Sequence, residues 1–187
     1  MDPTKLLEAD HRQVEELVDR IHKTEGSARS PLIGELRAAL EAHMQLEEEV
    51  VYPAMTPVTG EERAQEGQTE HELVRRALGE MLNLAPDEPG FEAALETTKA
   101  AIEHHVQDEE GDVFPTLRRD GEAVLNDMAT PFMRRRLELG LAAGPDALAA
   151  ASTKDELLEE ARLAGVEGTG SMTKDELAKA LSTRMTS

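Results

Sequence analysis

Apolar residues recur at steps of three and four along the first 140 residues, which predicts four amphipathic helices. The stripes cover residues 7–21, 36–50, 64–81 and 91–109, and Gly- and Pro-containing segments separate them. A fifth amphipathic stretch covers residues 122–139, where Pro131 is expected to bend or interrupt the helix. The short connections favour an all-α fold, an antiparallel four-helix up-and-down bundle with an extra helix outside it.

The sequence changes character near residue 140, beyond which there is no histidine. We expect the bundle at 1–140, a linker at 141–151, and a small helix–loop–helix unit at 152–187. In this last unit the string Thr-Lys-Asp-Glu-Leu occurs twice, beginning at Thr153 and at Thr173. Each copy fits a helix start in which the Thr caps the helix and the Glu closes a capping box.

Charge and cysteine content exclude several classes of protein. The chain has 39 Asp and Glu against 20 Lys and Arg, a net charge of -19, which argues against nucleic acid or an anionic membrane as partner. It has no Cys, which excludes disulfides, iron–sulfur clusters and a thiol nucleophile, and is consistent with a cytoplasmic location. No signal peptide and no membrane span are expected, since no apolar run approaches about 20 residues.

Six polar residues interrupt the apolar stripes. Each inward face carries a His near its middle, and two faces carry a Glu one turn later. The six are His11, His43, Glu47, His71, His105 and Glu109. A buried charge costs several kcal/mol unless it is paired or bound to a metal. A lone His on such a face is ordinary, but His and Glu at i and i+4 lie about 6 Å apart and can share one ion.

An internal repeat brings these residues into two matching sets. Residues 43–53 (HMQLEEEVVYP) and 105–115 (HVQDEEGDVFP) agree at His, Gln, Glu, Glu, Val and Pro. Upstream, residues 10–14 (DHRQV) parallel residues 70–74 (EHELV). Two helix pairs of this kind are expected to pack about a pseudo-twofold axis and to hold two metal ions.

The mixture of imidazole and carboxylate ligands favours iron over manganese or zinc. We expect two non-haem iron ions joined by a bridging oxide or hydroxide. With four His and two bridging Glu, about two coordination positions stay open for water or a small ligand.

On these residues the sequence resembles the hemerythrin-like (HHE cation-binding) family over about residues 5–118. The resemblance rests on His11, His71 and the two His-x3-Glu runs that end in Tyr-Pro and Phe-Pro. It implies a four-helix bundle with a di-iron centre that binds dioxygen, nitric oxide or peroxide. It also implies that the six residues named above are the metal ligands.

The sequence departs from the oxygen-carrying members of that family. Those proteins have a further His one turn from the third-helix His, and their fourth-helix carboxylate is an Asp one residue later. Here the neighbours of His71 are Gly67 and Arg75, and Glu110 occupies the later position beside the repeat-consistent Glu109. An additional exchangeable position on one metal favours redox chemistry, such as catalase-like peroxide decomposition, over reversible oxygen carriage.

Several roles stay open. Glu48 and Glu110, like Asp10 and Glu70, fit either acceptors for a ligand imidazole or a solvated face. Tyr52 is expected to pack in the core, because on a regular helix it points away from His43. The alternative is a phenolate that binds ferric iron, if Pro53 distorts the helix enough to turn Tyr52 inward. His22 is expected to be structural and His104 to lie on the surface.

Two other interpretations of the sequence are open to comparison. A ferritin-like centre needs Glu-x-x-His on two helices, and only Glu8 with His11 fits. The alternative function is a non-catalytic oxygen, nitric oxide or iron sensor that signals through the C-terminal unit. That unit resembles the Rho-N/SAP helix–loop–helix module, which implies tethering to a nucleic acid or protein. Its weak charge favours a protein partner for 152–187.

Overall fold

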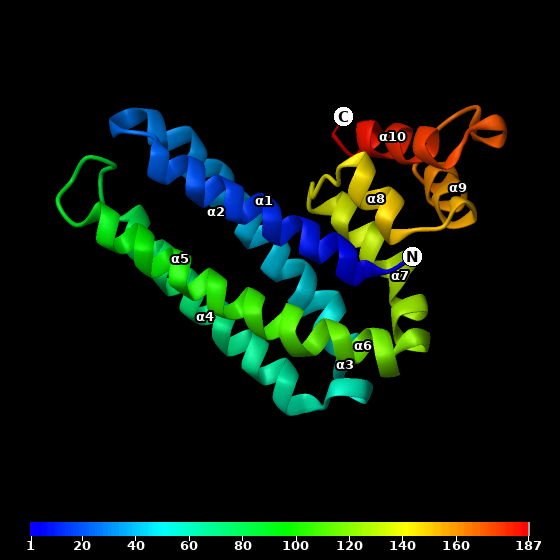
Figure 1. Cartoon of the computed structure of the whole chain (residues 1–187), viewed down its shortest axis with the longest axis horizontal. Coiled ribbons are helices and arrows are strands. Elements are labelled where there is room, and N and C mark those ends of the chain that lie inside the picture. Colours follow the sequence, from blue (N-terminus) through cyan, green and yellow to red (C-terminus); the bar gives the residue numbers. More distant parts are fainter. Residues whose placement is uncertain (187) are drawn as a thin grey trace.

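Four long helices form the body of the molecule in a computed structural model that describes residues 1–186 (Figure 1). They are α1 (Pro3–Lys23), α2 (Arg29–Leu46), α4 (Glu61–Leu82) and α5 (Phe91–Asp108). Helix α1 packs along α2 and α4 along α5, and each pair is antiparallel. The predicted all-helical bundle is therefore confirmed. Among residues 1–186, no helix is long and apolar enough to cross a bilayer.

Turns of π-helix follow α2 and α5 at matching places in the repeat. They are η2 (Glu47–Val51) and η3 (Glu109–Val113), and they lead into α3 (Tyr52–Thr59) and α6 (Phe114–Asp120). The Tyr52 amide bonds back five residues to the Glu47 carbonyl. Pro53 gives a physical reason, because it has no N–H to donate and its ring clashes with the carbonyl four residues earlier in a regular helix.

The wide turn changes which side chains face inward. A regular helix would continue the stripe at Val50, whereas the structure buries Val51 and Tyr52 and leaves Val50 half-buried. One inserted residue rotates everything beyond it by about 100° around the helix. The part of the stripe predicted beyond Glu47 was therefore wrong by one position.

Helix α7 (Glu122–Glu138) lies against the ends of the bundle and corresponds to the predicted fifth helix. It continues through Pro131, which does not interrupt it. Its buried face includes Phe132, Met133 and Arg136. Helix α7 covers α6 and η2 and has no counterpart in the other half of the repeat.

The C-terminal residues form α8 (Pro145–Ala151), α9 (Lys154–Leu163), a short 3-10 turn η4 (Thr169–Ser171) and α10 (Lys174–Met185). Both predicted capping boxes are present, with Thr153 and Thr173 accepting from the amides of Glu156 and Glu176. Ser187, the last residue of the predicted unit, lies outside the described residues.

The segment predicted as a linker, 141–151, is partly helical. It contains α8, whose Leu148 and Ala151 are buried in the same apolar cluster as Leu7 of α1. The Asp2 amide donates to the Ala151 carbonyl at 2.6 Å, so the start of α1 lies against α8. Apolar residues in this segment pack on the bundle instead of connecting two separate bodies, and the division at 140 and 152 stays a prediction.

Candidate metal centre

The six residues singled out by the sequence are all buried in the middle of the bundle. His11, His43, His71 and His105 come from α1, α2, α4 and α5, and Glu47 and Glu109 open the two π turns. Ligand atoms of His11, His43, Glu47, His105 and Glu109 lie within 4.8 Å of one another. His71 joins them through its Nε2, which is 3.1 Å from Glu47 Oε2.

The four imidazoles form two pairs, one in each half of the repeat. Ring centroids are 4.9 Å apart for His11 and His43 and 4.7 Å apart for His71 and His105. Across the halves, the His43 and His105 centroids are 6.3 Å apart. The centre therefore has two ends, which we call the first end (His11, His43) and the second end (His71, His105).

The two glutamates lie between these ends and each reaches both. Glu47 Oε1 is 3.2 Å from His43 Nε2, and its Oε2 is 3.1 Å from His71 Nε2. Glu109 Oε2 is 3.4 Å from His11 Nε2 and 3.7 Å from His105 Nε2. Every His thus turns Nε2 toward a shared carboxylate, an arrangement that suits two adjacent cations.

The outer nitrogen of each imidazole faces another carboxylate. The Nδ1 atoms lie 2.8 Å from Glu110 for His11, 3.5 Å from Asp10 for His43, 2.8 Å from Glu48 for His71, and 3.1 Å from Glu70 for His105. A carboxylate at Nδ1 holds the proton there and leaves Nε2 as a lone-pair donor directed inward. The sequence left the roles of these four acidic residues open. In the structure they form two equivalent pairs in the repeat, and each lies beside one of the four imidazoles.

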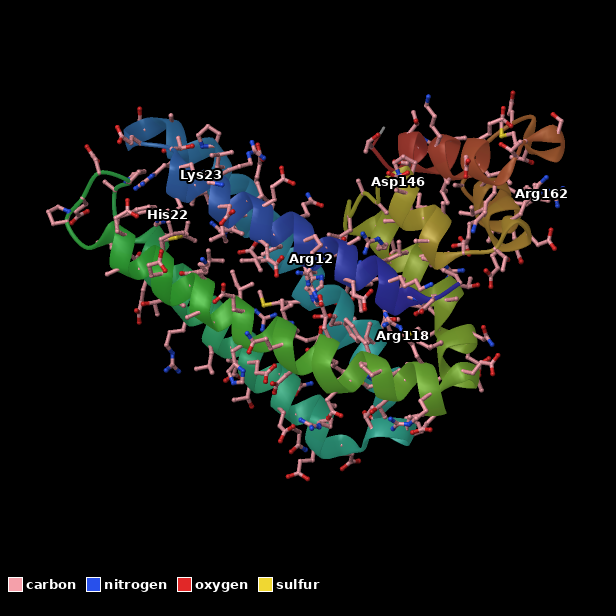
Figure 2. The ribbon with its side chains drawn as sticks, in the orientation of Figure 1. Arg12, His22, Lys23, Arg118, Asp146 and Arg162 are labelled. Atoms are coloured by element: carbon pink, nitrogen blue, oxygen red, sulfur yellow. The ribbon has the colours of Figure 1, made fainter. Side chains whose placement is uncertain are left out.

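Two of these outer carboxylates also pair with surface arginines. Glu48 lies 2.8 Å from Arg75, and Glu110 lies 2.5 Å from Arg12, which Figure 2 labels on the ribbon. These ion pairs fix the carboxylates from outside. Each of the two imidazoles that they hold, on His71 and His11, is thereby oriented by a chain of contacts that begins at the surface.

Many inward polar atoms have no hydrogen-bond partner among residues 1–186. The buried ones are Nε2 of His11, His43 and His105, Oε1 of Glu47, and Oε2 of Glu109. Leaving one such group unsatisfied costs about 1–3 kcal/mol. Imidazole and carboxylate donors converging in this number fit a pair of first-row transition metal ions.

The pKa shifts of the buried His and Glu side chains also fit a site that binds cations. Burial disfavours a charge on His43, but the Glu47 and Asp10 carboxylates outweigh it and raise the pKa of His43 to about 10. Burial likewise opposes ionisation of Glu47, yet the facing imidazoles of His43, His105 and His71 hold its pKa well below the usual range. The pKa of His105 is raised well above its ordinary value, against burial, by Glu109 and Glu47. The site favours ionised carboxylates and positive charge between them.

Tyr52 packs in the apolar core, as predicted, and also directs its phenol to the second end. Its hydroxyl lies 3.0 Å from His71 Nε2 and donates to Glu109 Oε1 at 3.3 Å. Burial, then the Glu47 and Glu109 carboxylates, raise the pKa of the phenol far above its ordinary value, so it stays protonated. The π turn η2 produces this orientation, because it rotates Tyr52 inward.

Gly67 makes room for that phenol. A Cβ at this position would lie 2.6 Å from both Cζ and the hydroxyl oxygen of Tyr52. The hydroxyl of Tyr52 thus occupies the space that a side chain at position 67, one turn before His71, would fill.

Arg136 is the residue that sequence reasoning missed. It is fully buried, and its guanidinium donates to both Asp10 oxygens, at 2.5 and 2.6 Å, and to the Ala142 carbonyl at 3.2 Å. Burial opposes the charge of Asp10, but Arg136 outweighs it and lowers the pKa of that carboxyl. A basic residue on the inward face of the fifth helix was the available signal.

His22 and His104 lie outside the centre. Both side chains are more than half exposed, His22 near the end of α1 and His104 on the outer face of α5. This agrees with their interpretation from sequence as residues without a direct role in the centre.

Comparison with known proteins agrees with this geometry. The sequence profile of the hemerythrin HHE cation binding domain matches residues 2–117, which include all six buried residues. A DNA nickase of Nostoc sp. (strain PCC 7120 / SAG 25.82 / UTEX 2576) is 26% identical over 121 residues, covering 64% of this chain and 34% of the nickase. The chain thus spans about a third of that relative, and no solved structure gives a significant match. From the matched profile and the residues that it covers, the chain belongs to the hemerythrin HHE cation-binding domain family.

Proposed function

We propose that the chain holds two non-haem iron ions and reacts with a small oxidant, hydrogen peroxide first among them. The observation that carries this proposal is the direction of the inner nitrogens: all four imidazoles turn Nε2 toward the two shared glutamates. The proposed ligands are His11, His43, Glu47, His71, His105 and Glu109. Iron in such a set supplies one-electron redox chemistry toward peroxide, dioxygen or nitric oxide.

The protein's own groups prepare the site for that chemistry. The outer carboxylates fix the orientation of the imidazoles, and the two apolar clusters above and below the centre exclude bulk water. Tyr52 holds an O–H within hydrogen-bond distance of Glu109 Oε1. A protonated phenol beside a shared carboxylate places a proton at the second end, where the narrow pocket lined by Tyr52, Gly67 and Glu109 reaches the centre.

Dioxygen release from hydrogen peroxide tests the proposed activity. We expect iron-loaded protein to convert peroxide to dioxygen and water faster than the same amount of free iron. His71→Ala should lose most of this activity, because it removes the Nε2 that faces Glu47. His22→Ala removes an exposed His remote from the centre and serves as the control. Full iron occupancy without dioxygen release would contradict the proposed activity.

A second candidate function is a sensor that reports the state of the centre through the C-terminal helices. It is favoured by one contact path, in which His43 faces Asp10, Asp10 binds Arg136, and Arg136 donates to the Ala142 carbonyl. That carbonyl lies three residues before α8. Hydrogen exchange of residues 141–186 in metal-free, ferrous and ferric protein tests it. A sensor requires protection that differs between these states, and identical protection would exclude this path.

Nicking of DNA is not carried over from the similar Nostoc protein. The chain covers a third of that relative, and a net charge of -19 disfavours contact with a phosphate backbone. A protein partner for residues 152–187 stays the proposal for the C-terminal unit.

A further inference from the structure

A second group of metal-competent residues lies on the surface just outside the second end. Ligand atoms of Glu70, His104 and Asp108 are all within 4.8 Å of one another. His104 and Asp108 are four residues apart on α5, with Nδ1 and Oδ1 3.8 Å apart, and they are 62% and 42% exposed. This pair repeats on the outer face of α5 the i, i+4 spacing of His105 and Glu109.

Glu70 joins this surface group to the buried centre. Its side chain is only 12% exposed, and its Oε2 lies 3.1 Å from Nδ1 of His105. A ligand atom of the same side chain lies within 4.8 Å of ligand atoms of His104 and Asp108. One carboxylate therefore contacts a residue of the centre and also belongs to the outer cluster.

Two adjoining hollows connect the cluster with the centre. An open depression of about 520 Å³ is lined by Glu66, Glu70, His104 and Asp108, among others. A narrow pocket of about 10 Å³ shares Glu66, Glu70 and Asp108 with it and extends to Tyr52 and Glu109. Glu109 is buried, and its Oε2 has no hydrogen-bond partner among the described residues. An unpaired acceptor thus lies at the inner end of a passage whose outer end carries three ligand-type side chains.

The fold does not require these residue types. At the corresponding places in the first half of the repeat stand Ala42 and Leu46, and Leu46 is buried in the apolar cluster packed with α7. In the second half this face is exposed, and it carries His104 and Asp108. The two metal-competent side chains therefore lie where an ion from solvent can reach them.

The charge around the depression favours a cation. Its lining includes Glu62 and Glu66 in addition to the three ligand-type residues, and the chain as a whole is strongly acidic. Arg63 lies in the same lining, but its guanidinium is tied to Glu66 at 2.9 Å and also to Asp112. An excess of negative charge around a surface depression raises the local concentration of cations.

We infer that Glu70, His104 and Asp108 bind a divalent first-row transition metal ion and pass it inward to the buried centre. One imidazole and two carboxylates suit Fe²⁺ or Mn²⁺, with remaining positions filled by water. The passage holds about one water molecule, so transfer requires side-chain motion at its walls. The transfer role rests on the proposed iron centre, whereas binding at the surface does not.

Surface binding is tested with Mn²⁺ on the full chain, followed by the electron paramagnetic resonance signal of free Mn²⁺. Protein with an iron-filled centre should bind one further Mn²⁺ per chain. The double variant His104→Ala with Asp108→Asn should lose that ion. The control is His22→Ala, another exposed His facing two carboxylates, Glu92 and Glu96, at the far end of the bundle (Figure 2). Equal binding by the double variant would overturn the surface site.

Transfer is tested by mixing metal-free protein with Fe²⁺ under anaerobic conditions and trapping unbound iron with a chelator at successive times. The double variant should load about tenfold more slowly, or slower still, yet reach the same final iron content as the wild type. Equal loading rates would overturn the transfer role and leave the iron centre standing. A lower final content would also overturn it, because the residues would then serve retention. If no protein retains iron, the proposed function fails, and Mn²⁺ binding by the metal-free chain still decides the surface site.

Discussion

The two halves of the repeat supply the same ligands but surround them differently. Each half gives one His from its first helix, a His-x3-Glu from its second, and a π turn that begins at the Glu. At the first end, Phe114 stacks on His11 with ring centroids 5.9 Å apart, and Arg136 closes the site behind Asp10. At the second end, Tyr52 presents a hydroxyl, and Glu70 lines an open surface depression.

The residues shared by the two halves are the candidate ligands, and they follow the repeat closely. The residues that differ surround the candidate ligands. In the proposed function, access and proton supply are assigned to the second end, where Tyr52 and the adjoining depression lie. We therefore expect variants in the two halves to behave differently even where their positions correspond.

The largest difference should come from the carboxylates behind the ligand histidines. Arg136→Met leaves Asp10 as a buried carboxylate without its cation, which should lower the free energy of unfolding by about 3–5 kcal/mol. Glu70→Gln in the other half keeps an oxygen acceptor for His105 and should cost about 1 kcal/mol or less. Urea unfolding of the metal-free proteins measures both.

A coupled variant sharpens that comparison. Asp10→Asn combined with Arg136→Met removes both charges and should recover much of the stability that Arg136→Met loses. Equal losses for Arg136→Met and Glu70→Gln would show that the two halves are closed to the same degree, contrary to the structure.

An intermediate effect is expected from the glycine beside Tyr52. Gly67→Ala introduces a methyl group 2.6 Å from the phenol and should reduce stability by about 1–3 kcal/mol. Gly79→Ala, on the same helix, meets nothing within 4 Å and should stabilise by up to about 1 kcal/mol through helix propensity. Opposite signs in urea unfolding are the expected result. A stabilising Gly67→Ala would contradict the tight contact between α4 and Tyr52.

The smallest effect on stability should come from Tyr52→Phe. It removes the hydrogen bonds to His71 and Glu109, at a cost of about 1 kcal/mol, and makes the second end resemble the first, which has Phe114. Iron content should be unchanged, while peroxide turnover should fall. Loss of a visible absorption band of the ferric protein would show that the phenol oxygen itself binds iron. Unchanged turnover would contradict a role for this hydroxyl as proton holder.

Sequence periodicity predicted the parts of the structure that follow a regular helix. The inward positions of His11, His43, His71 and His105 follow from steps of three and four residues, and the repeat identified Glu109 in preference to its neighbour Glu110. The corresponding buried positions are all found. Whether these residues bind metal stays a prediction that the geometry supports.

Two features do not follow from helical periodicity. The π turns shift the helical phase by one residue and turn Tyr52 inward, and Pro53 indicated such a distortion only as an alternative to regular helix geometry. The burial of Arg136 depends on how α7 packs against α1, and amphipathic patterns do not specify such packing. The helix within 141–151 was not predicted, because Gly144 and Pro145 in that segment favoured a linker, although Pro145 begins the helix.

Iron content per chain tests the central claim most directly. We predict two iron atoms per chain, measured by elemental analysis of protein that carries no histidine tag, and clearly fewer in His71→Ala, because the Nε2 of His71 faces the carboxylate of Glu47. His22→Ala should match the wild type. Clearly fewer than two iron atoms per chain, or a content that His71→Ala leaves unchanged, would contradict the account.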